Sequence, residues 1–251
     1  MYLTEDQIEN GFWFHSGKES FPPEAITYPD EYKGDANINI VCTQLSIGSY
    51  QQRKLVTEWC QLIPKLENIR YLWFNSKVNQ ALFEAACQNQ GIEGLYIDWS
   101  GIKDLSSLRN LKKLKFLHIG SSASIESIDV LSQMERLIVL ELENIKRIRN
   151  LSPLRSLRGL EGLGIEGSTW TTQIVDTLEP LCDLQNLRYV FLSNLKTLDK
   201  TLKPLAQIKT LMHIRTAYWW PKSEFELLRD SLPALKYGSP FDFELIDRFG
   251  T

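Results

Sequence analysis

An apolar frame of six residues, L-x-x-L-x-L with Ile, Val, Phe or Thr at some of the Leu positions, recurs seven times along this chain. The frames begin at Ile69, Ile92, Leu114, Leu137, Leu160, Leu187 and Leu211. The intervals between successive frames are 23, 22, 23, 23, 27 and 24 residues. A unit of this length cannot bury its own apolar residues, so the regular spacing predicts a stack of repeats that share one continuous core.

The segments between the frames carry a second pattern, an apolar residue at every third position. One repeat shows it at Ile102, Leu105, Leu108 and Leu111. A period of three is typical of 3₁₀ turns. The tetrad L-x-P-L occupies residues 151–154, 178–181 and 202–205, where proline fixes φ and opens a helical turn. We expect 3₁₀ turns in these returns, and α-helices in two longer ones, 78–88 and 171–184, because each holds enough good helix formers for about three turns.

Residues 101–119, GIKDLSSLRNLKKLKFLHI, resemble the short leucine-rich repeats of the internalin type, which are about 22 residues long. The resemblance covers about residues 66–237. It implies an α/β fold, a leucine-rich repeat solenoid: a horseshoe-shaped, right-handed β-α superhelix of about seven to eight repeats. Its parallel β-sheet would line the concave side and short 3₁₀ or α returns the convex side.

Proteins of this family usually carry an asparagine three positions after the last leucine of each strand, where its side chain links adjacent repeats. In this chain the corresponding residues are Lys77, Ser100, Ser122, Ile145, Ser168, Leu195 and Trp219. The resemblance therefore implies that serines supply only part of the usual bonding between repeats.

The ends of the repeat array depart from the frame, and we expect them to cap its open core. We assign residues 1–65 to an N-terminal cap, with a strand at 37–43 and an amphipathic helix at 52–65. Residues 66–237 form the repeats, and 238–251 form a C-terminal cap tail that we expect to complete the chain. A helix at 221–232 and a last strand at 235–238 are expected just before that tail.

Charge and composition exclude several classes of partner. The net charge is −3, and residues 1–36 contain eight acids and only two lysines, so no concentrated basic stripe is available for nucleic acid. No run of about 18 to 20 apolar residues predicts a membrane span, and the N-terminus lacks the pattern of a signal peptide. Four scattered cysteines are expected to be reduced. We therefore expect a cytoplasmic protein, unless a leader has been removed.

The leucines of each frame point into the core, so the residues between them face the concave side. Aromatic residues gather at both ends of this face and acids in its middle. Aromatic anchors are typical of protein interfaces, and acids favour a basic partner. The predicted partner-binding residues are Tyr71, Trp73, Tyr96, Asp98, Trp99, Phe116, His118, Glu141, Glu143, Glu166, Tyr189, Phe191, Arg215 and Tyr218.

Three patterns that suggest other chemistry are weaker. Residues 162–167 match G-x-G-x-x-G, but they lie along a repeat strand, where no helix N-terminus meets a pyrophosphate. The three histidines have no metal-ligand spacing, so we expect no metal and no cofactor. Glu141, Glu143 and Glu166 resemble an acid/base set, but an open sheet favours a charged binding patch over a catalytic site. We expect the chain not to be an enzyme.

The favoured hypothesis is a monomeric module that binds another protein, one with a basic surface, through the concave face. One alternative is an antidote or immunity protein that inhibits a basic toxin domain. A second is a non-catalytic scaffold fragment of a larger protein. A homodimer through the aromatic face, and shielding of the concave face by the N-terminal segment, also stay open.

Overall fold

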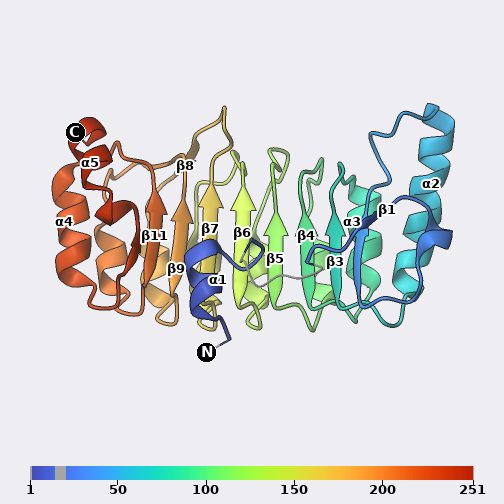
Figure 1. The fold of residues 1–251 in the computed structure, drawn as a ribbon, viewed down its shortest axis with the longest axis horizontal. Coiled ribbons are helices and arrows are strands. Elements are labelled where there is room, and N and C mark those ends of the chain that lie inside the picture. Colours follow the sequence, from blue (N-terminus) through green and yellow to red (C-terminus); the bar gives the residue numbers. More distant parts are fainter. Residues whose placement is uncertain (1, 15–20, 251) are drawn as a thin grey trace.

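The computed structural model describes residues 2–14 and 21–250. Among these residues, ten strands form one curved, wholly parallel sheet that runs the length of the molecule, and strands adjacent in the sheet follow the order of the chain (Figure 1). The strands of this sheet are β1 (Ala25–Ile26), β2 (Asn37–Ile40), β3 (Tyr71–Phe74), β4 (Gly94–Ile97), β5 (Phe116–Ile119), β6 (Val139–Glu143), β7 (Gly162–Glu166), β9 (Tyr189–Leu192), β11 (His213–Thr216) and β12 (Tyr237–Gly238). The predicted solenoid with its parallel concave sheet is confirmed.

The returns on the convex side are helical and mostly short. The longer helices lie toward the ends of the array: α2 (Ser49–Leu62), α3 (Gln80–Gln88), α4 (Lys222–Ser231) and α5 (Phe243–Phe249). The central returns are five-residue 3₁₀ helices: Ser106–Asn110, Asp129–Gln133, Ser152–Ser156, Glu179–Asp183 and Lys203–Gln207. Three of them carry proline in their first turn, as the L-x-P-L tetrads predict. Shorter 3₁₀ turns span Pro29–Glu31, Ile63–Lys65 and Ser239–Phe241.

One core runs through the whole stack. The frame leucines and the leucines of the returns, such as Leu117, Leu140 and Leu154, are completely buried and belong to a single cluster from Ile38 to Ile246. Burying one such side chain contributes roughly 1.5–3 kcal/mol. The repeat pattern therefore accounts for the stability of the array, because every repeat shares its apolar surface with both neighbours.

The return at 171–184 does not form the predicted α-helix. It contains β8 (Gln173–Val175), which pairs with β10 (Leu195–Thr197) in a separate two-stranded parallel sheet, followed by the 3₁₀ helix Glu179–Asp183. The β-branched residues at 171–175 favour extended backbone, and Pro180 suits the first turn of a short helix. The other predicted return helix is confirmed as α3.

Serines supply part of the bonding between repeats. Ser100 and Ser122 are buried, and their hydroxyls lie 2.6 Å apart in adjacent repeats. Ser100 also accepts from the backbone N–H of Ile102 at 3.2 Å. Lys77 occupies the first of the seven positions at which the family usually carries asparagine, and there its backbone N–H donates to the Gln44 side chain. This agrees with the partial ladder that the sequence implies.

The elements expected at the two ends are present. The strand at 37–43 is β2, and the helix at 52–65 is α2 with the 3₁₀ turn Ile63–Lys65 after it. The helix at 221–232 is α4, and the last strand is the short β12. All four cysteines are free thiols, and burial raises the pKa of Cys42 to about 12.

Candidate functional site: the concave face

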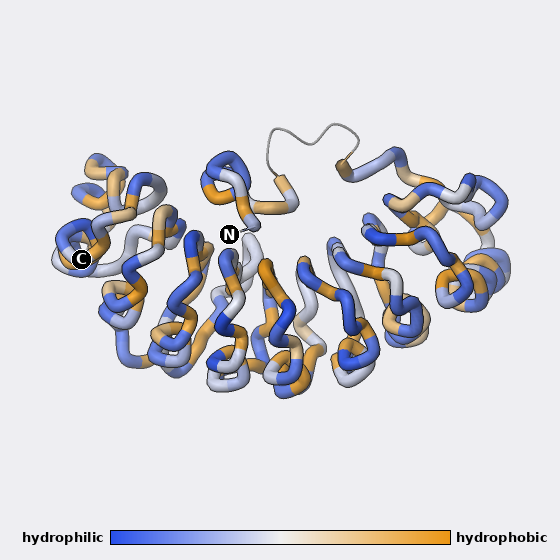
Figure 2. The backbone as a smooth tube through the Cα atoms, turned by 90° about the horizontal axis from the view of Figure 1, so that it is seen from below, coloured by the Kyte–Doolittle hydropathy of each residue, from blue (hydrophilic) through white to orange (hydrophobic). Residues whose placement is uncertain are grey.

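Residues 2–14, here called the docked segment, lie in the hollow of the solenoid. The segment contains one helix, α1 (Glu5–Asn10), which lies in front of the concave face near β7 and β9 (Figures 1 and 2). Thr4 caps α1 by accepting from the backbone N–H of Gln7, whose side chain accepts from the backbone of Thr4 in return. Gly11 ends the helix with a φ of +86°, which turns Phe12 and Trp13 toward the sheet. Most residues avoid this φ, and glycine adopts it readily.

Four apolar side chains of the docked segment pack on the sheet. Leu3, Ile8, Phe12 and Trp13 are buried in a cluster separate from the main core. The Phe12 ring stacks on Phe116 at 3.9 Å between centroids, and Trp13 meets Trp73 edge-on at 5.7 Å. The sheet residues on which they pack, here called the aromatic half of the concave face, are Tyr71, Trp73, Tyr96, Phe116, Tyr189 and Phe191.

Two glycines make room for these rings. A Cβ on Gly94 would lie 2.3 Å from the ring of Tyr71 and 3.3 Å from Trp13. A Cβ on Gly162 would lie 2.3 Å from the ring of Tyr189. Each glycine therefore leaves room for the aromatic ring of the residue paired with it on the adjacent strand.

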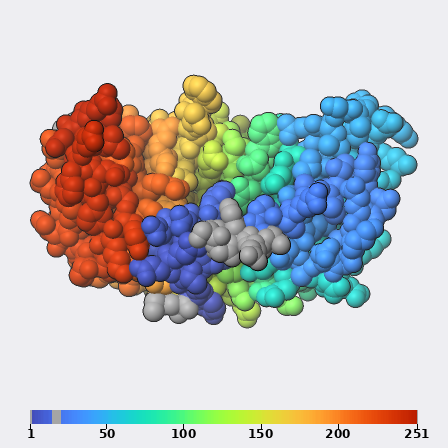
Figure 3. Space-filling view, in the orientation of Figure 1, coloured from blue at the N-terminus to red at the C-terminus, as the bar shows by residue number. Residues whose placement is uncertain are grey.

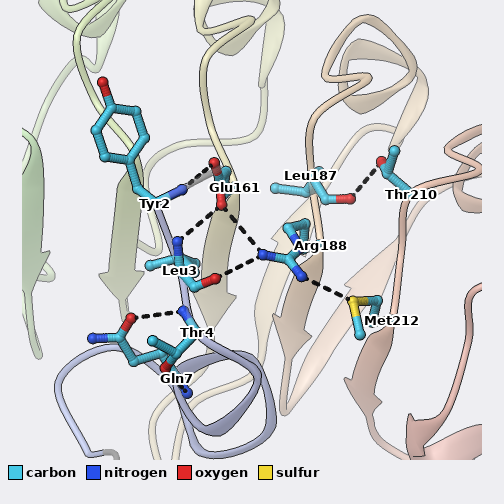
Figure 4. Close-up of polar contacts among 9 residues, drawn as sticks. All are labelled: Tyr2, Leu3, Thr4, Gln7, Glu161, Leu187, Arg188, Thr210 and Met212. Carbon is cyan, nitrogen blue, oxygen red and sulfur yellow. Dashed lines mark hydrogen bonds and ion pairs between the residues drawn. The ribbon is translucent and has the colours of Figure 1, made fainter.

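A buried ion pair binds the backbone at the start of the docked segment (Figure 4). Glu161 is 5% exposed and accepts from the N–H groups of Tyr2 at 2.8 Å and Leu3 at 3.1 Å. Arg188 donates to the carbonyl of Leu3 at 2.7 Å and lies 3.7 Å from the Glu161 carboxylate. The pair thus recognises main-chain donors and an acceptor together, as a peptide-binding site does.

Two further contacts hold α1 against the C-terminal repeats. The Nδ1 atom of His213 lies 3.0 Å from the carbonyl oxygen of Ile8. Burial lowers the pKa of His213, so the ring is held neutral, with Nδ1–H as the donor to that carbonyl. At the exposed rim, Glu5 accepts from Lys236 at 2.9 Å and from the Tyr237 hydroxyl at 3.0 Å.

Glu141 lies beneath the docked segment. It is 6% exposed, accepts from the Tyr189 hydroxyl at 2.8 Å and lies 3.0 Å from Nδ1 of His118. Burial raises the pKa of Tyr189 well above its usual value, and Glu141 raises it further, so the phenol remains a donor. His118 lies on β5, next to β6, and Tyr189 lies on β9, two strands away on the other side, and together they satisfy a carboxylate that is almost completely buried.

The other part of the concave face, where the strands end, is open (Figure 3). Three carboxylates lie along it, and we call them the acidic edge: Asp98, Glu143 and Glu166. Glu143 and Glu166 are directly paired across β6 and β7. Burial raises the pKa of Glu143, as do the nearby Glu166 and Asp98 carboxylates, while His118 lowers it.

Arg215 and two aromatic residues accompany the acidic edge. The Arg215 guanidinium lies 3.6 Å from the centre of the Phe191 ring and 3.6 Å from the Glu166 carboxylate. Trp99, which follows β4, is 41% exposed. Tyr218 is half-buried, and its hydroxyl donates to the Asp242 carboxylate.

The fourteen predicted binding residues thus divide into two groups. Six are buried beneath or beside the docked segment: Trp73, Phe116, His118, Glu141, Tyr189 and Phe191. Tyr71 and Tyr96 are half-buried and pack against the same cluster. The remaining six have accessible side chains: Asp98, Trp99, Glu143, Glu166, Arg215 and Tyr218.

Sequence reasoning missed the residues that receive the docked segment. Glu161, Arg188 and His213 lie just before or at the start of a strand, where the repeat frame gives no indication of their partners. One signal was present: Leu3, Ile8, Phe12 and Trp13 are apolar residues within an otherwise acidic stretch. Shielding of the concave face by the N-terminal segment stays open in the sequence, because these apolar residues do not indicate the surface on which they pack.

The competing motifs have structural explanations. Gly162 and Gly164 of the G-x-G-x-x-G match lie in β7, as expected, and the Cβ of an alanine at Gly167 would lie 2.4 Å from two backbone carbonyls. No group of three or more His, Cys, Asp or Glu suited to a metal ion occurs in residues 2–14 and 21–250. No helix in the same part of the chain is long and apolar enough to cross a membrane.

Comparison with solved structures agrees with the repeat geometry. An internalin (inlF) of Listeria monocytogenes strain 4b F2365 matches with a TM-score of 0.54 and 19% sequence identity, over 70% of this chain and 55% of the internalin. Internalin C2 (inlC2) of the same strain matches at 20% identity over 61% of this chain and 74% of the other, with a TM-score of 0.41, which is too low to define a shared fold. No family model matches the chain, and no curated protein matches it.

The match and the geometry together define the class. The chain is a leucine-rich repeat solenoid with an internalin-like fold, a long parallel sheet and short helical returns. It spans about half of the inlF structure that it matches, and at 19% identity the likeness concerns the fold.

Proposed function

We propose that this protein is a binding module that holds a partner protein with a basic surface against the open part of its concave face. The observation that carries the proposal is the acidic edge. Asp98 follows β4, Glu143 and Glu166 end the adjacent strands β6 and β7, and burial together with like charge raises the pKa of Glu143. Among the described residues, Arg215 is the cation that forms an ion pair with an acidic-edge carboxylate, that of Glu166.

A surface of this kind favours a cation from outside. Holding carboxylates close together costs free energy, and an arriving lysine or arginine relieves the repulsion. The rigid parallel sheet fixes the carboxylates before binding, so little ordering is required of this side of the interface. Trp99, exposed beside Asp98, offers the kind of aromatic anchor that interfaces enrich.

We also propose that the protein acts as a monomer. A homodimer through the concave face would have to bury the aromatic half. The docked segment of the same chain already covers it (Figure 3), and the carboxylates of the acidic edge keep accessible side chains. Like-charged faces repel each other, so the acidic edge disfavours self-association through this side.

The test is quantitative affinity capture from a lysate of the source organism with the intact protein as bait. The variant Asp98→Lys/Glu143→Lys reverses two charges of the acidic edge. We expect it to lose a partner that the parent protein retains and that elutes as the salt concentration rises, because screening weakens exposed charge pairs.

The matched control is Glu58→Lys/Glu126→Lys, which makes the same change of charge at two exposed sites away from the concave face. It should capture the partner as well as the parent does, and circular dichroism should show that all three proteins are folded. Equal recovery by the edge variant and the control would refute the acidic edge as the binding surface.

A further inference from the structure

The docked segment contacts the solenoid through groups that any peptide possesses. Its backbone N–H groups at Tyr2 and Leu3 meet Glu161, its carbonyl at Leu3 meets Arg188, and its carbonyl at Ile8 meets His213. Recognition of main-chain groups by side chains of a rigid sheet, combined with apolar pockets, is how domains hold peptide ligands.

The apolar contacts have the character of an interface. The Phe12 and Trp13 rings stack and pack edge-on against the aromatic half, and both side chains are at most 5% exposed. Polar contacts lie elsewhere on the segment, at the exposed edge of the C-terminal repeats, where Glu5 is bonded to Lys236 and Tyr237. Buried aromatic anchors are typical of binding hot spots.

The solenoid does not depend on the docked segment for its own core. Of the described residues, none from 2–14 belongs to the main cluster, which begins at Ile38 and holds all the repeats together. The docked segment, in turn, has little structure of its own: α1 is six residues long and buries only Ile8. A helix this short is stable only when a surface holds it.

The fit also leaves one group unsatisfied. Nε1–H of Trp13 is buried and has no hydrogen-bond acceptor among the residues that the structure describes. A buried donor without an acceptor weakens the docking of the chain that carries it.

From these contacts we propose that the aromatic half of the concave face is a peptide-binding site, and that residues 2–14 are its tethered, exchangeable occupant. The ligand class is a short amphipathic peptide of the same pattern: an aliphatic residue, a second one five positions later, and a Gly-Phe-Trp turn three positions after that. This goes beyond the proposed function, because it concerns a different surface and a different partner chemistry from the acidic edge.

The covalent link between the docked segment and the solenoid determines how readily a free peptide replaces the segment. Six residues, 15–20, join the docked segment to Phe21, which packs at the same cluster. A short link keeps the segment at an effective concentration of about a millimolar or more at its own site. A free peptide therefore binds weakly to the intact chain and much more strongly once the link is cut.

The experiment uses the full chain with a specific protease site in place of residues 15–20. The protein folds with its segment present and is then cut. A fluorescently labelled synthetic peptide of residues 1–14 is added for a day, and fluorescence anisotropy is measured against protein concentration. We expect saturable binding to the cut protein, and binding at least about 30-fold weaker to the uncut protein.

Two variant peptides define the register. The peptide with Phe12→Ala and Trp13→Ala should bind at least about 30-fold more weakly than the parent peptide, because it lacks both anchors. The peptide with Tyr2→Ala should match the parent within about threefold, since the Tyr2 side chain is 70% exposed and only its backbone contacts Glu161.

Either of two results would overturn the proposal. The cut segment remaining attached without exchange would make it a fixed part of the fold. Loss of the helical and strand signal after cutting, measured by circular dichroism, would make the segment necessary for folding. The same titration on the cut Asp98→Lys/Glu143→Lys protein should give unchanged peptide affinity, so failure of this proposal is distinguishable from failure of the acidic edge.

Discussion

At the scale of single residues, the buried Glu161 carboxylate is the most consequential polar contact of the docked segment. It accepts from two backbone N–H groups and pairs with Arg188, whose side chain is 15% exposed. Glu161→Gln keeps the shape but removes the charge that these donors face. We expect a loss of about 1–3 kcal/mol in the free energy of unfolding, measured with urea.

The control for Glu161 is Glu126→Gln, which removes an exposed ion pair with Arg147. Exposed pairs contribute little, so this variant should stay within about 0.5 kcal/mol of the parent. If the two substitutions had the same effect, the Glu161 pair would count as a surface contact.

His213 predicts a pH dependence of stability. Burial lowers its pKa from the usual 6.5, so the unfolded chain binds a proton in a range where the folded protein does not. Stability therefore rises with pH up to about 6.5 and falls below it, by at most about 1.4 kcal/mol per pH unit for this one proton. His213→Gln cannot titrate, and the difference between urea midpoints at pH 7.5 and 5.5 should shrink in this variant. An unchanged difference would mean that other groups set the dependence.

Single residues also mark the limit of what the sequence predicts. The alternation within each frame places Trp73, Phe116 and Glu141 on the concave side, and the structure agrees. Their burial does not follow, because it depends on contacts with residues more than 50 positions away in the chain. Glu161 and Arg188 occupy the second position of their frames, and the repeat pattern does not indicate which partner a residue at that position meets.

At the scale of elements, β7 shows why glycine occurs inside a strand. The ring of Tyr189 lies where a side chain at Gly162 would point, with a Cβ separation of 2.3 Å. Gly162→Ala must displace this completely buried ring, and overpacking of this kind costs about 1–3 kcal/mol or more. Thermal unfolding should show a clearly lower midpoint.

The matched substitution for β7 is Gly159→Ala, in the return before the strand. Its new Cβ would meet the nearest atom at 3.5 Å, an ordinary contact. This variant should unfold within about 0.5 kcal/mol of the parent, and an equal loss in both variants would point to backbone freedom as the reason for these glycines.

Glu143, the acidic-edge residue on β6, is expected to favour partner binding and to lower the stability of the fold. Because the folded protein raises the pKa of Glu143, the folded state favours its protonated form, and stability falls as pH rises from 4.5 through that raised pKa. At pH 7, Glu143→Gln should therefore stabilise the fold slightly, by less than about 1 kcal/mol, while weakening partner capture. A destabilised Gln variant would show that Glu143 serves the fold.

Element types followed from the sequence wherever one signal dominated. Prolines and the period of three predicted the 3₁₀ helices such as Ser152–Ser156, and periodicity predicted α2 and α4. The prediction was wrong at 171–184, where length and helix formers suggested a helix. In this return the pairing of β8 with β10 outweighs the local helix propensity, because the adjacent repeat supplies a strand partner that the local sequence does not reveal.

At the scale of the whole molecule, the docked segment joins parts that a solenoid normally keeps apart. Repeats contact only their neighbours, so a stack has no built-in link between its ends. Here contacts at Glu161, His213 and Lys236 join residues 158 to 231 positions apart in the chain. The hollow of the horseshoe is therefore bridged, which limits flexing of the arc around the docked segment.

The docked segment and the repeats bury their apolar side chains in two separate clusters. This separation determines whether the segment can detach while the repeats stay folded. Because the main core contains none of residues 2–14, we expect the docked segment to open without unfolding the stack.

Phe12→Ala removes the ring that stacks on Phe116 and should cost about 3 kcal/mol in the docking of the segment. In hydrogen exchange, the amides of Leu3 and Ile8 should then exchange at least about 30-fold faster, while those of β5 to β7 stay within about threefold of the parent. Phe14→Ala, at a 54% exposed side chain, should change neither group. Equal acceleration in the strands would mean that the segment and the repeats form a single cooperative unit.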